Sequence, residues 1–297
     1  MTDNLRGALW MMLAMLAFAI EDALIKFALQ TYGLTAGSAM VLFGLMAMAL
    51  SALYTRVQGV GLWHPAYLQP RLLIRTGLEF FGRLFFALSL AYNTLTVTTT
   101  ILQAAPLVVT LGAALILKER VQARRWIAMG VGLVGVLMVL RPVPEQFSPA
   151  AILAVLGMLG FAGRDLATRA SPPAVHAAQL GVLGFGVVTL AGLILLAFDP
   201  KPFSFPITAG LGAMALTALA GVLAYTALTF AMRTGDVSAV APFRYIRLVA
   251  ALAIAVLVFG ERPDLLTLAG ATLIVGSGLY TLWRERQVRA QRTGTHP

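Results

Sequence analysis

Ten apolar stretches, each close to the length of a membrane-spanning helix, constrain the fold of this chain most strongly. A helix needs about 20 apolar residues to cross the hydrocarbon core of a bilayer. Of 297 residues, 59% are hydrophobic and 11% are charged, whereas roughly 25% of the residues in soluble domains are charged. The sequence therefore predicts an all-α integral membrane protein with ten transmembrane helices. The predicted spans are Gly7–Leu29, Ala36–Tyr54, Leu72–Ala91, Thr98–Leu117, Ala123–Leu140, Ala150–Thr168, Ala174–Phe198, Ile207–Ala231, Ala239–Phe259 and Leu265–Trp283.

Two short motifs recur at nearly the same offset and indicate a duplicated unit. Phe18–Asp22 (Phe-Ala-Ile-Glu-Asp) is echoed 143 residues later by Phe161–Asp165 (Phe-Ala-Gly-Arg-Asp), and Glu119-Arg120 is echoed 142 residues later by Glu261-Arg262. Five helices per copy is an odd number, so the second copy must cross the membrane in the opposite direction. The prediction is two inverted five-helix repeats around a central cavity. Its parts are a first repeat (1–141), a linker (142–148), a second repeat (149–283) and a basic cytoplasmic tail (284–297).

The basic residues between the apolar stretches predict the orientation. With both termini inside, the cytoplasmic loops and tail hold 13 lysines and arginines, including Arg75, and the outer loops hold three. Because loops rich in lysine and arginine stay in the cytoplasm, we expect cytoplasmic N- and C-termini in a bacterial inner membrane. The net charge of +10 is then explained by orientation, and no nucleic-acid partner is inferred.

Several classes of function are disfavoured by what the sequence lacks. There is no cysteine, and the three histidines (His64, His176 and His296) form no cluster along the chain, so we expect no metal site and no cofactor. The absence of a G-x-x-x-x-G-K-[ST] phosphate loop argues against an ATP-driven pump. The competing interpretation is an intramembrane enzyme acting on lipid-linked substrates. That enzyme would need an acidic metal cluster or a nucleophile–base pair, and neither is visible.

Motifs in both halves resemble one known family. Pro106 with Leu117–Arg120 in the first half, and Ala241–Tyr245 with Phe259–Pro263 in the second, are similar to the drug/metabolite transporter superfamily, EamA type. The resemblance implies ten helices in two inverted five-helix repeats. Within the superfamily the chain is most similar to bacterial exporters of amino acids and related metabolites, such as aromatic amino acid exporters. One departure is that Leu248 stands where a counterpart of Pro106 would be.

Three acid–base pairs lie four residues apart inside the predicted spans. They are Asp22–Lys26, Glu79–Arg83 and Asp165–Arg169. A charge at the bilayer centre costs about 2.5–3.5 kcal/mol on insertion scales, so such residues usually face a polar interior. Each pair could neutralise itself on one helix face and serve only packing. That interpretation stays open beside a role in substrate binding.

A transported zwitterion needs a cation for its carboxylate, an anion for its ammonium group and apolar walls for its side chain. Residues of these kinds in or near the predicted spans are the candidate binding residues: Glu21, Glu79, Phe80, Arg83, Gln103, Tyr225, Arg244, Tyr245 and Arg247. Arg247 lies about 12 Å below the cytoplasmic end of its helix, beyond the reach of its side chain to the surface. We expect it to face the central cavity. The function expected is a secondary transporter or facilitator that exports small metabolites, amino acids in particular, with the substrate and the lipid bilayer as its partners and no obligatory protein partner.

Overall fold

The computed structural model describes residues 2–93, 95–142, 148–198, 202–205, 208–259 and 262–293. Every regular element in these residues is helical. The first half contains α1 (Asp3–Tyr32), α2 (Ala36–Val57), the 3-10 helix η1 (Pro65–Leu68), α3 (Pro70–Tyr92), α4 (Leu95–Leu102), α5 (Ala105–Leu115) and α6 (Ala123–Leu140). The second half contains α7 (Ala151–Arg169), α8 (Ala177–Phe198), α9 (Thr208–Arg233), α10 (Val237–Val240), η3 (Ala241–Tyr245), α11 (Ile246–Phe259) and α12 (Leu265–Thr293).

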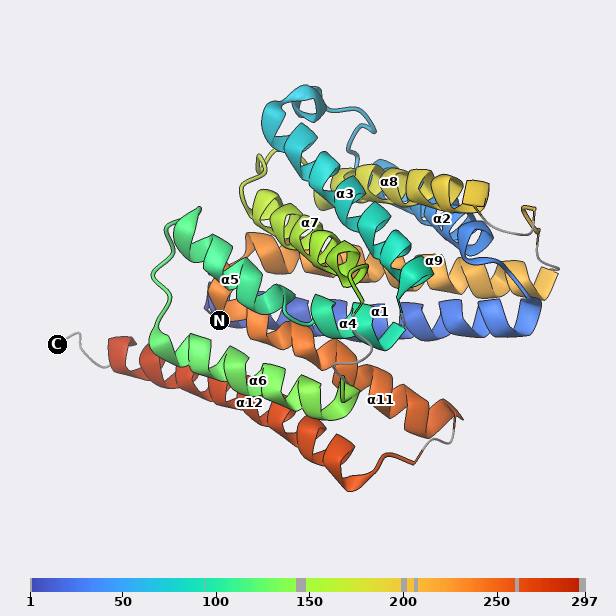
Figure 1. Cartoon of the computed structure of the whole chain (residues 1–297). Coiled ribbons are helices and arrows are strands. Elements are labelled where there is room, and N and C mark those ends of the chain that lie inside the picture. Colours follow the sequence, from blue (N-terminus) through green and yellow to red (C-terminus); the bar gives the residue numbers. More distant parts are fainter. Residues whose placement is uncertain are drawn as a thin grey trace.

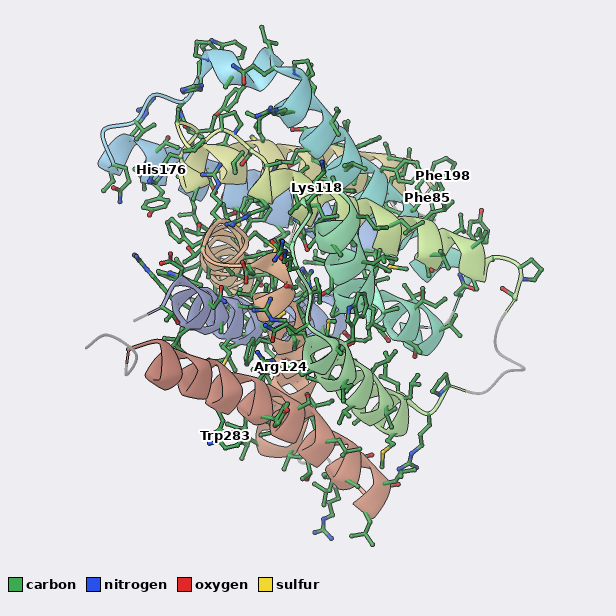
Figure 2. All side chains as sticks on the ribbon, turned by 90° about the vertical axis from the view of Figure 1, so that its left-hand side faces the viewer. Phe85, Lys118, Arg124, His176, Phe198 and Trp283 are labelled. Carbon is green, nitrogen blue, oxygen red and sulfur yellow. The ribbon has the colours of Figure 1, made fainter. Side chains whose placement is uncertain are left out.

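The helices have the length and surface of a multi-pass membrane protein. Eight helical segments of the described chain are long and apolar enough to cross a bilayer. The prediction of ten spans also counts α3, which is 23 residues long but carries charges along its length, and the apolar part of α12, Leu265–Thr281. Side chains project outward from the bundle (Figure 2), and many exposed ones are large and apolar, including Leu115 and Ile127. Such a surface suits lipid and not water.

Helices far apart in the sequence pack side by side in four pairs. Helix α1 lies along α9, α2 along α8, α3 along α7 and α6 along α12 (Figure 1). Glycines permit the closest approaches. A Cβ atom on Gly160 of α7 would lie 2.5 Å from the Cα of Gly82 on α3, and one on Gly135 of α6 would lie 2.6 Å from the carbonyl oxygen of Gly270 on α12. The α3–α7 pair brings the charged side chains of these two helices into contact.

Two of the predicted spans are interrupted. The predicted span Thr98–Leu117 is divided between α4 and α5, with Pro106 in the first turn of α5. The predicted span Ala239–Phe259 is divided between α10, η3 and α11, with Pro242 in η3. Proline lacks the N–H that continues a helix, which explains both positions. The sequence showed no counterpart of Pro106, and the structure corrects this because Pro242 accompanies an interruption in the second half.

Hydrogen bonds outside the long helices join segments from the two halves. The Glu119 carboxylate accepts from the backbone N–H groups of Val237 (3.0 Å) and Ser238 (3.2 Å), so it caps the start of α10. At α12, the carboxylate of Asp264 pairs with Arg141 and accepts from the N–H of Thr267 at 2.9 Å. These hydrogen bonds hold the pKa of Asp264 below its usual range. The counterpart of Glu119, Glu261, and the linker residues 143–147 lie outside the described residues.

Candidate substrate pathway

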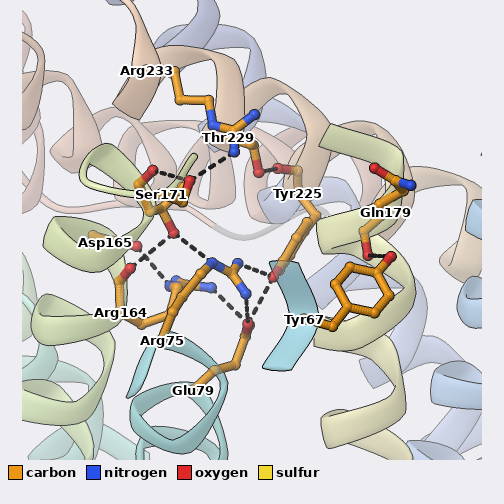
Figure 3. Close-up of polar contacts among 11 residues, drawn as sticks. Tyr67, Arg75, Glu79, Arg164, Asp165, Ser171, Gln179, Tyr225, Thr229 and Arg233 are labelled. Carbon is orange, nitrogen blue, oxygen red and sulfur yellow. Dashed lines mark hydrogen bonds and ion pairs between the residues drawn. The ribbon is translucent and has the colours of Figure 1, made fainter. Parts of the chain in front are cut away.

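Glu79 of α3 is the centre of a buried cluster of charged side chains (Figure 3). Its side chain is 0% exposed and meets three groups. Arg164 Nη1 of α7 donates to Oε1 at 2.9 Å, and the Tyr225 hydroxyl of α9 donates to Oε2 at 2.7 Å. Arg75 Nη1, one turn earlier on α3, lies 3.2 Å from Oε2. One carboxylate thereby joins three helices.

Asp165, next to Arg164 on α7, extends the cluster. Its Oδ1 lies 2.7 Å from Arg164 Nε, and its Oδ2 pairs with Arg244 of η3. Arg75 also donates to Thr168 Oγ1 at 2.9 Å and to the Tyr225 hydroxyl. We call this set the buried ion-pair network: Arg75, Glu79, Arg164, Asp165, Thr168, Tyr225 and Arg244.

The network is densely packed and positively charged. Three arginines face two acids, so the net charge of the network is +1 when all five groups are ionised. The guanidinium carbons of Arg75 and Arg164 each lie 5.8 Å from the centre of the Tyr225 ring. Leu228, Thr229 and Met232 of α9 complete the lining, and the space between these groups does not admit a water molecule. At this level the bundle is closed.

The charged pairs proposed from the sequence are corrected by this geometry. Glu79 pairs with Arg75 and Arg164, and Asp165 pairs with Arg164 and Arg244. The interpretation left open from the sequence, that each acid is neutralised by the base four residues onward on its own helix, therefore does not hold for these two acids. The guanidinium of Arg169 donates instead to the backbone carbonyl of Arg233. Spacing along one helix shows which partners are within reach, but facing helices decide which partner is closest.

Glu21 and Arg83 lie beside the network without being bonded into it. The Glu21 side chain on α1 is 5% exposed, and its Oε2 atom has no hydrogen-bond partner in the described part of the chain. The Nε atom of Arg83 is also buried without a hydrogen bond among these residues. The Arg83 guanidinium stacks at 5.5 Å from the centre of the Phe161 ring. It interacts electrostatically with both Glu79 and Glu21.

Arg247 has an acidic partner on another helix. Its Nε and Nη2 atoms donate to the two carboxylate oxygens of Asp22 at 2.8 and 2.7 Å. The guanidinium lies 5.0 Å from the centre of the Phe18 ring, also on α1. The side chains of Arg247 and Asp22 are 41% and 47% exposed. The partner of Arg247 is therefore an acid at a partly open junction of α1 and α11, and the expectation that Arg247 faces a central cavity stays a prediction.

Three other candidates lie apart from the network. Tyr245 is 0% exposed and packs in a separate apolar cluster with Val136 of α6 and Ile274 of α12. Gln103 lies at the break between α4 and α5, and no hydrogen bond from its side chain to the network is present among the described residues. Phe80 is half-buried on α3, directly after Glu79. Of the nine candidates, the network itself contains Glu79, Tyr225 and Arg244.

Four network residues were missing from the candidates predicted from the sequence: Arg75, Arg164, Asp165 and Thr168. Arg75 was counted with the cytoplasmic loops, yet it is 1% exposed within α3. A signal for it was present, because Arg75 precedes Glu79 by the same four residues that separate Glu79 from Arg83. Arg164 and Asp165 belong to the repeated Phe-Ala-x-x-Asp motif, which served to detect the duplication, and Asp165 was considered only as the partner of Arg169.

Comparison with protein-family models gives two matches in this chain. Residues 5–141 and residues 148–283 each match the model of the EamA-like transporter family. The chain belongs to this family. EamA-like proteins are part of the drug/metabolite transporter superfamily and are transporters, so the interpretation as an intramembrane enzyme is set aside.

Curated relatives of this EamA-like chain carry the names of transporters. It is 28% identical to an S-adenosylmethionine uptake transporter of Rickettsia bellii over 74% of this chain and 75% of the relative. It is 27% identical to a riboflavin transporter of Vibrio cholerae over 97% of both chains. It is 28% identical to a pseudopaline exporter of Pseudomonas aeruginosa over 91% of this chain and 93% of the relative.

A solved crystal structure has the same fold. It superposes with a TM-score of 0.78 over 93% of this chain and 96% of the other, at 19% sequence identity. This EamA-like chain is therefore an all-helical, multi-pass membrane transporter for small molecules. In the part of the chain that the structure describes, no three histidine, aspartate or glutamate side chains gather to hold a metal ion.

Proposed function

We propose that this protein is a secondary transporter that carries a small metabolite across the bacterial inner membrane by alternating access. The observation that carries the proposal is the buried ion-pair network. Ionisable groups inside a membrane bundle are costly and typically mark a pathway. The network links α3 of the first family-matched segment to α7, α9 and η3 of the second. A movement of one segment against the other would therefore break and remake it.

The helix pairs support an arrangement of ten spans in two inverted repeats. We count α4 with α5 as one interrupted span, and α10, η3 and α11 as another. The first span of residues 1–141 (α1) then packs against the third span of residues 149–283 (α9). In the same way, the first span of residues 149–283 (α7) packs against the third span of residues 1–141 (α3). The second spans pair with each other, as do the fifth spans (α2 with α8, α6 with α12). This reciprocity is what a two-fold relation between residues 1–141 and 149–283 would produce, with 142–148 as the linker.

The interrupted spans support the same arrangement. They fall in the fourth position of each repeat, at Pro106 and at Pro242. Interrupted helices at corresponding positions of two repeats are a feature of secondary transporters, because the freed backbone groups and helix ends line the pathway. In this chain the second interruption, η3, places Arg244 against Asp165.

The orientation proposed from the loop charges places the network toward the cytoplasm. With both termini inside, α3 begins and α7 and α9 end on the cytoplasmic side, and the network lies in those parts of the three helices. Because the network excludes even water, the pathway in this conformation is closed toward the cytoplasm. The basic tail 284–297 is then cytoplasmic as well.

The substrate that we propose carries both an acidic and a cationic group, as an amino acid does. Arginines with acidic partners, aromatic side chains and the unbonded carboxylate oxygen of Glu21 support this class. S-adenosylmethionine, the molecule named in one relative, also has an amino-acid end. Export is the direction that we propose. The relatives' names include both uptake and export, and without a coupled ion net transport follows the substrate gradient.

Counterflow in proteoliposomes tests the proposal with the purified protein and no other component. Vesicles preloaded with one unlabelled compound are diluted into its labelled form; the panel is the twenty amino acids, S-adenosylmethionine and riboflavin. We expect transient accumulation of at least one compound. Glu79→Gln should abolish it, whereas Asp264→Asn, which alters an exposed pair between α6 and α12, should not. Accumulation of no compound, or accumulation equal in Glu79→Gln and the native protein, would overturn the proposal.

A further inference from the structure

Two successive layers of side chains cross the bundle between α3, α7 and α9. The first layer is the buried ion-pair network, with Glu79 on α3, Arg164 on α7 and Tyr225 on α9. One helical turn away on α3 lies Arg83, about 6 Å further along the axis. One turn away in the same direction, the antiparallel helices α7 and α9 present Phe161 and Gly221. The stacking of Arg83 on Phe161 at 5.5 Å shows that this second layer is continuous between α3 and α7.

The second layer differs from the first in its ion pairs. Three first-layer atoms also lack a hydrogen bond, namely Arg75 Nη1, Arg164 Nε and Asp165 Oδ1, but each takes part in an ion pair of 3.2 Å or less. No ion pair joins Glu21 or Arg83 to another described residue. In the first layer Glu79 meets three donors. In the second layer the Oε2 atom of Glu21 and the Nε atom of Arg83 are buried, and neither has a hydrogen-bond partner within the described ranges. Buried polar atoms are nearly always bonded, so two unbonded atoms of opposite charge in one layer indicate a missing partner.

Gly221 leaves the space in which the Glu21 carboxylate sits. A Cβ atom at this position would lie 3.3 Å from Glu21 Oε2 and 2.7 Å from the ring of Phe43 on α2. A larger residue would therefore displace the ring and crowd the carboxylate. The Phe43 ring lies beside Gly221, and the Phe161 ring stacks on Arg83, so each charged group of the layer has an aromatic ring near it. The unpaired acid thus lies in an aromatic environment with a glycine opposite it.

From this geometry we infer that Glu21 and Arg83 form the subsite for a zwitterionic head group, with the substrate ammonium at Glu21 and the substrate carboxylate at Arg83. This inference rests on the proposed function and adds the residues that bind the two charged groups of the substrate. The ammonium donates to the free carboxylate oxygen, and the guanidinium donates to the substrate carboxylate. A neutral zwitterion leaves the charge of the layer unchanged, since Glu21 and Arg83 already balance each other. A simple anion or cation would add an uncompensated charge in a buried site.

The subsite is also coupled to the first layer, the buried ion-pair network. Glu79 interacts electrostatically with Arg83, and the Arg164 guanidinium lies 5.7 Å from the centre of the Phe161 ring, so the network is coupled to the second layer at both groups. A carboxylate that binds Arg83 competes with Glu79 for it. Substrate binding in the second layer would thereby weaken the contacts that close the first.

The test compares matched compounds in proteoliposomes that contain the native protein. The probes are a labelled mixture of the twenty amino acids, the corresponding primary amines without the carboxylate, and the corresponding carboxylic acids without the amine. We expect counterflow of amino acids and at least tenfold less counterflow of both analogue sets. Glu21→Gln and Arg83→Gln should each reduce amino-acid counterflow at least tenfold, and Asp264→Asn should leave it unchanged.

A second variant keeps both charges and guards against a loss of folding. Gly221→Ala should raise the KM for amino acids while the protein still elutes as the native protein does on size exclusion, and Glu21→Asp should retain more activity than Glu21→Gln. Equal transport by Glu21→Gln and the native protein would overturn the subsite, as would native transport of riboflavin or of the analogues without transport of amino acids. Both results leave the proposed secondary transport intact, and the second removes the zwitterionic substrate class. Failure to transport any compound overturns the proposed function and the subsite together.

Discussion

Removing the charge of Glu79 should destabilise the folded bundle more than any comparable change at an exposed ion pair. Glu79→Gln leaves Arg75, Arg164 and Arg244 with Asp165 as the only acid, so the charge of the network rises from +1 to +2. At an effective dielectric constant of about 20, two unit charges about 4 Å apart attract by about 4 kcal/mol. Glu79 makes two such contacts, at 3.2 and 2.9 Å. Since neutralising it also removes its own desolvation penalty, we expect a net loss of about 3–5 kcal/mol.

Reversible unfolding in mixed micelles of a mild detergent and sodium dodecyl sulfate, followed by far-UV circular dichroism, measures this loss. The folding equilibrium constant should fall by a factor of roughly one hundred to several thousand. The control Asp264→Asn removes the charge from an exposed pair and should unfold with the native protein. If Glu79→Gln also unfolds with the native protein, the network does not hold the two halves together.

A charge exchange on α3 separates this account from pairing within one helix. If Glu79 and Arg83 served each other, Glu79→Arg combined with Arg83→Glu would preserve the pair. In the structure the exchange places a third arginine between Arg75 and Arg164. We therefore expect the double variant to be less stable than Glu79→Gln. Native stability in the double variant would restore the interpretation from the sequence.

Three further changes test how the bundle is held together. Gly160→Ala should lower transport and destabilise the fold by about 1–3 kcal/mol, because the added Cβ would lie 2.5 Å from the α3 backbone. The control is Gly77→Ala, whose added Cβ would have no atom within 4 Å. This control should be neutral in the same unfolding and transport assays. Arg247→Lys keeps the charge but loses the pair of hydrogen bonds to the Asp22 carboxylate, so counterflow should fall by roughly tenfold or more. Full transport activity of this variant would remove Arg247 from the pathway. Glu119→Ala leaves the first N–H groups of α10 unbonded and should cost about 0.5–2 kcal/mol in unfolding; no measurable cost would show that water replaces this cap.

Much of the fold could be predicted from the sequence because the bilayer limits the choices. An apolar stretch of about 20 residues in lipid forms a helix, because a helix bonds its backbone polar groups internally. The predicted spans agree with the helices to within a few residues at most ends. The two interruptions were harder to predict. Pro106 marks one, but the other occurs at Pro242 and not at Leu248, the position that corresponds to Pro106 by its distance from the Glu-Arg motif. A long apolar run indicates that a segment lies in the membrane, but it does not indicate that the helix is unbroken.

The site was predicted less well than the fold, for a physical reason. The residues of the network are five charged and two hydroxyl side chains on four elements, and their partners are decided by which helix faces which. Glu79 had arginines four residues away on both sides, and the sequence favoured neither. Tyr245 follows Arg244 directly but points to α6 and α12 instead of the network. Likewise, nothing in the repeated Glu-Arg motif indicates that Glu119 caps a helix in the other half.

Accessibility of a single cysteine beside the buried ion-pair network tests whether this closed layer opens during transport. The chain contains no cysteine, so Thr229→Cys gives one reporter in the native background. Thr229 is 2% exposed and lines the packed space beside Tyr225. In inside-out vesicles, a membrane-impermeant maleimide should label Thr229→Cys slowly at rest and much faster while substrate is transported. The control is Gln58→Cys in the exposed loop after α2, which should be labelled fast under both conditions. Labelling of Thr229→Cys that is equally fast with and without substrate, or that stays blocked while transport proceeds, would contradict alternating access through this network.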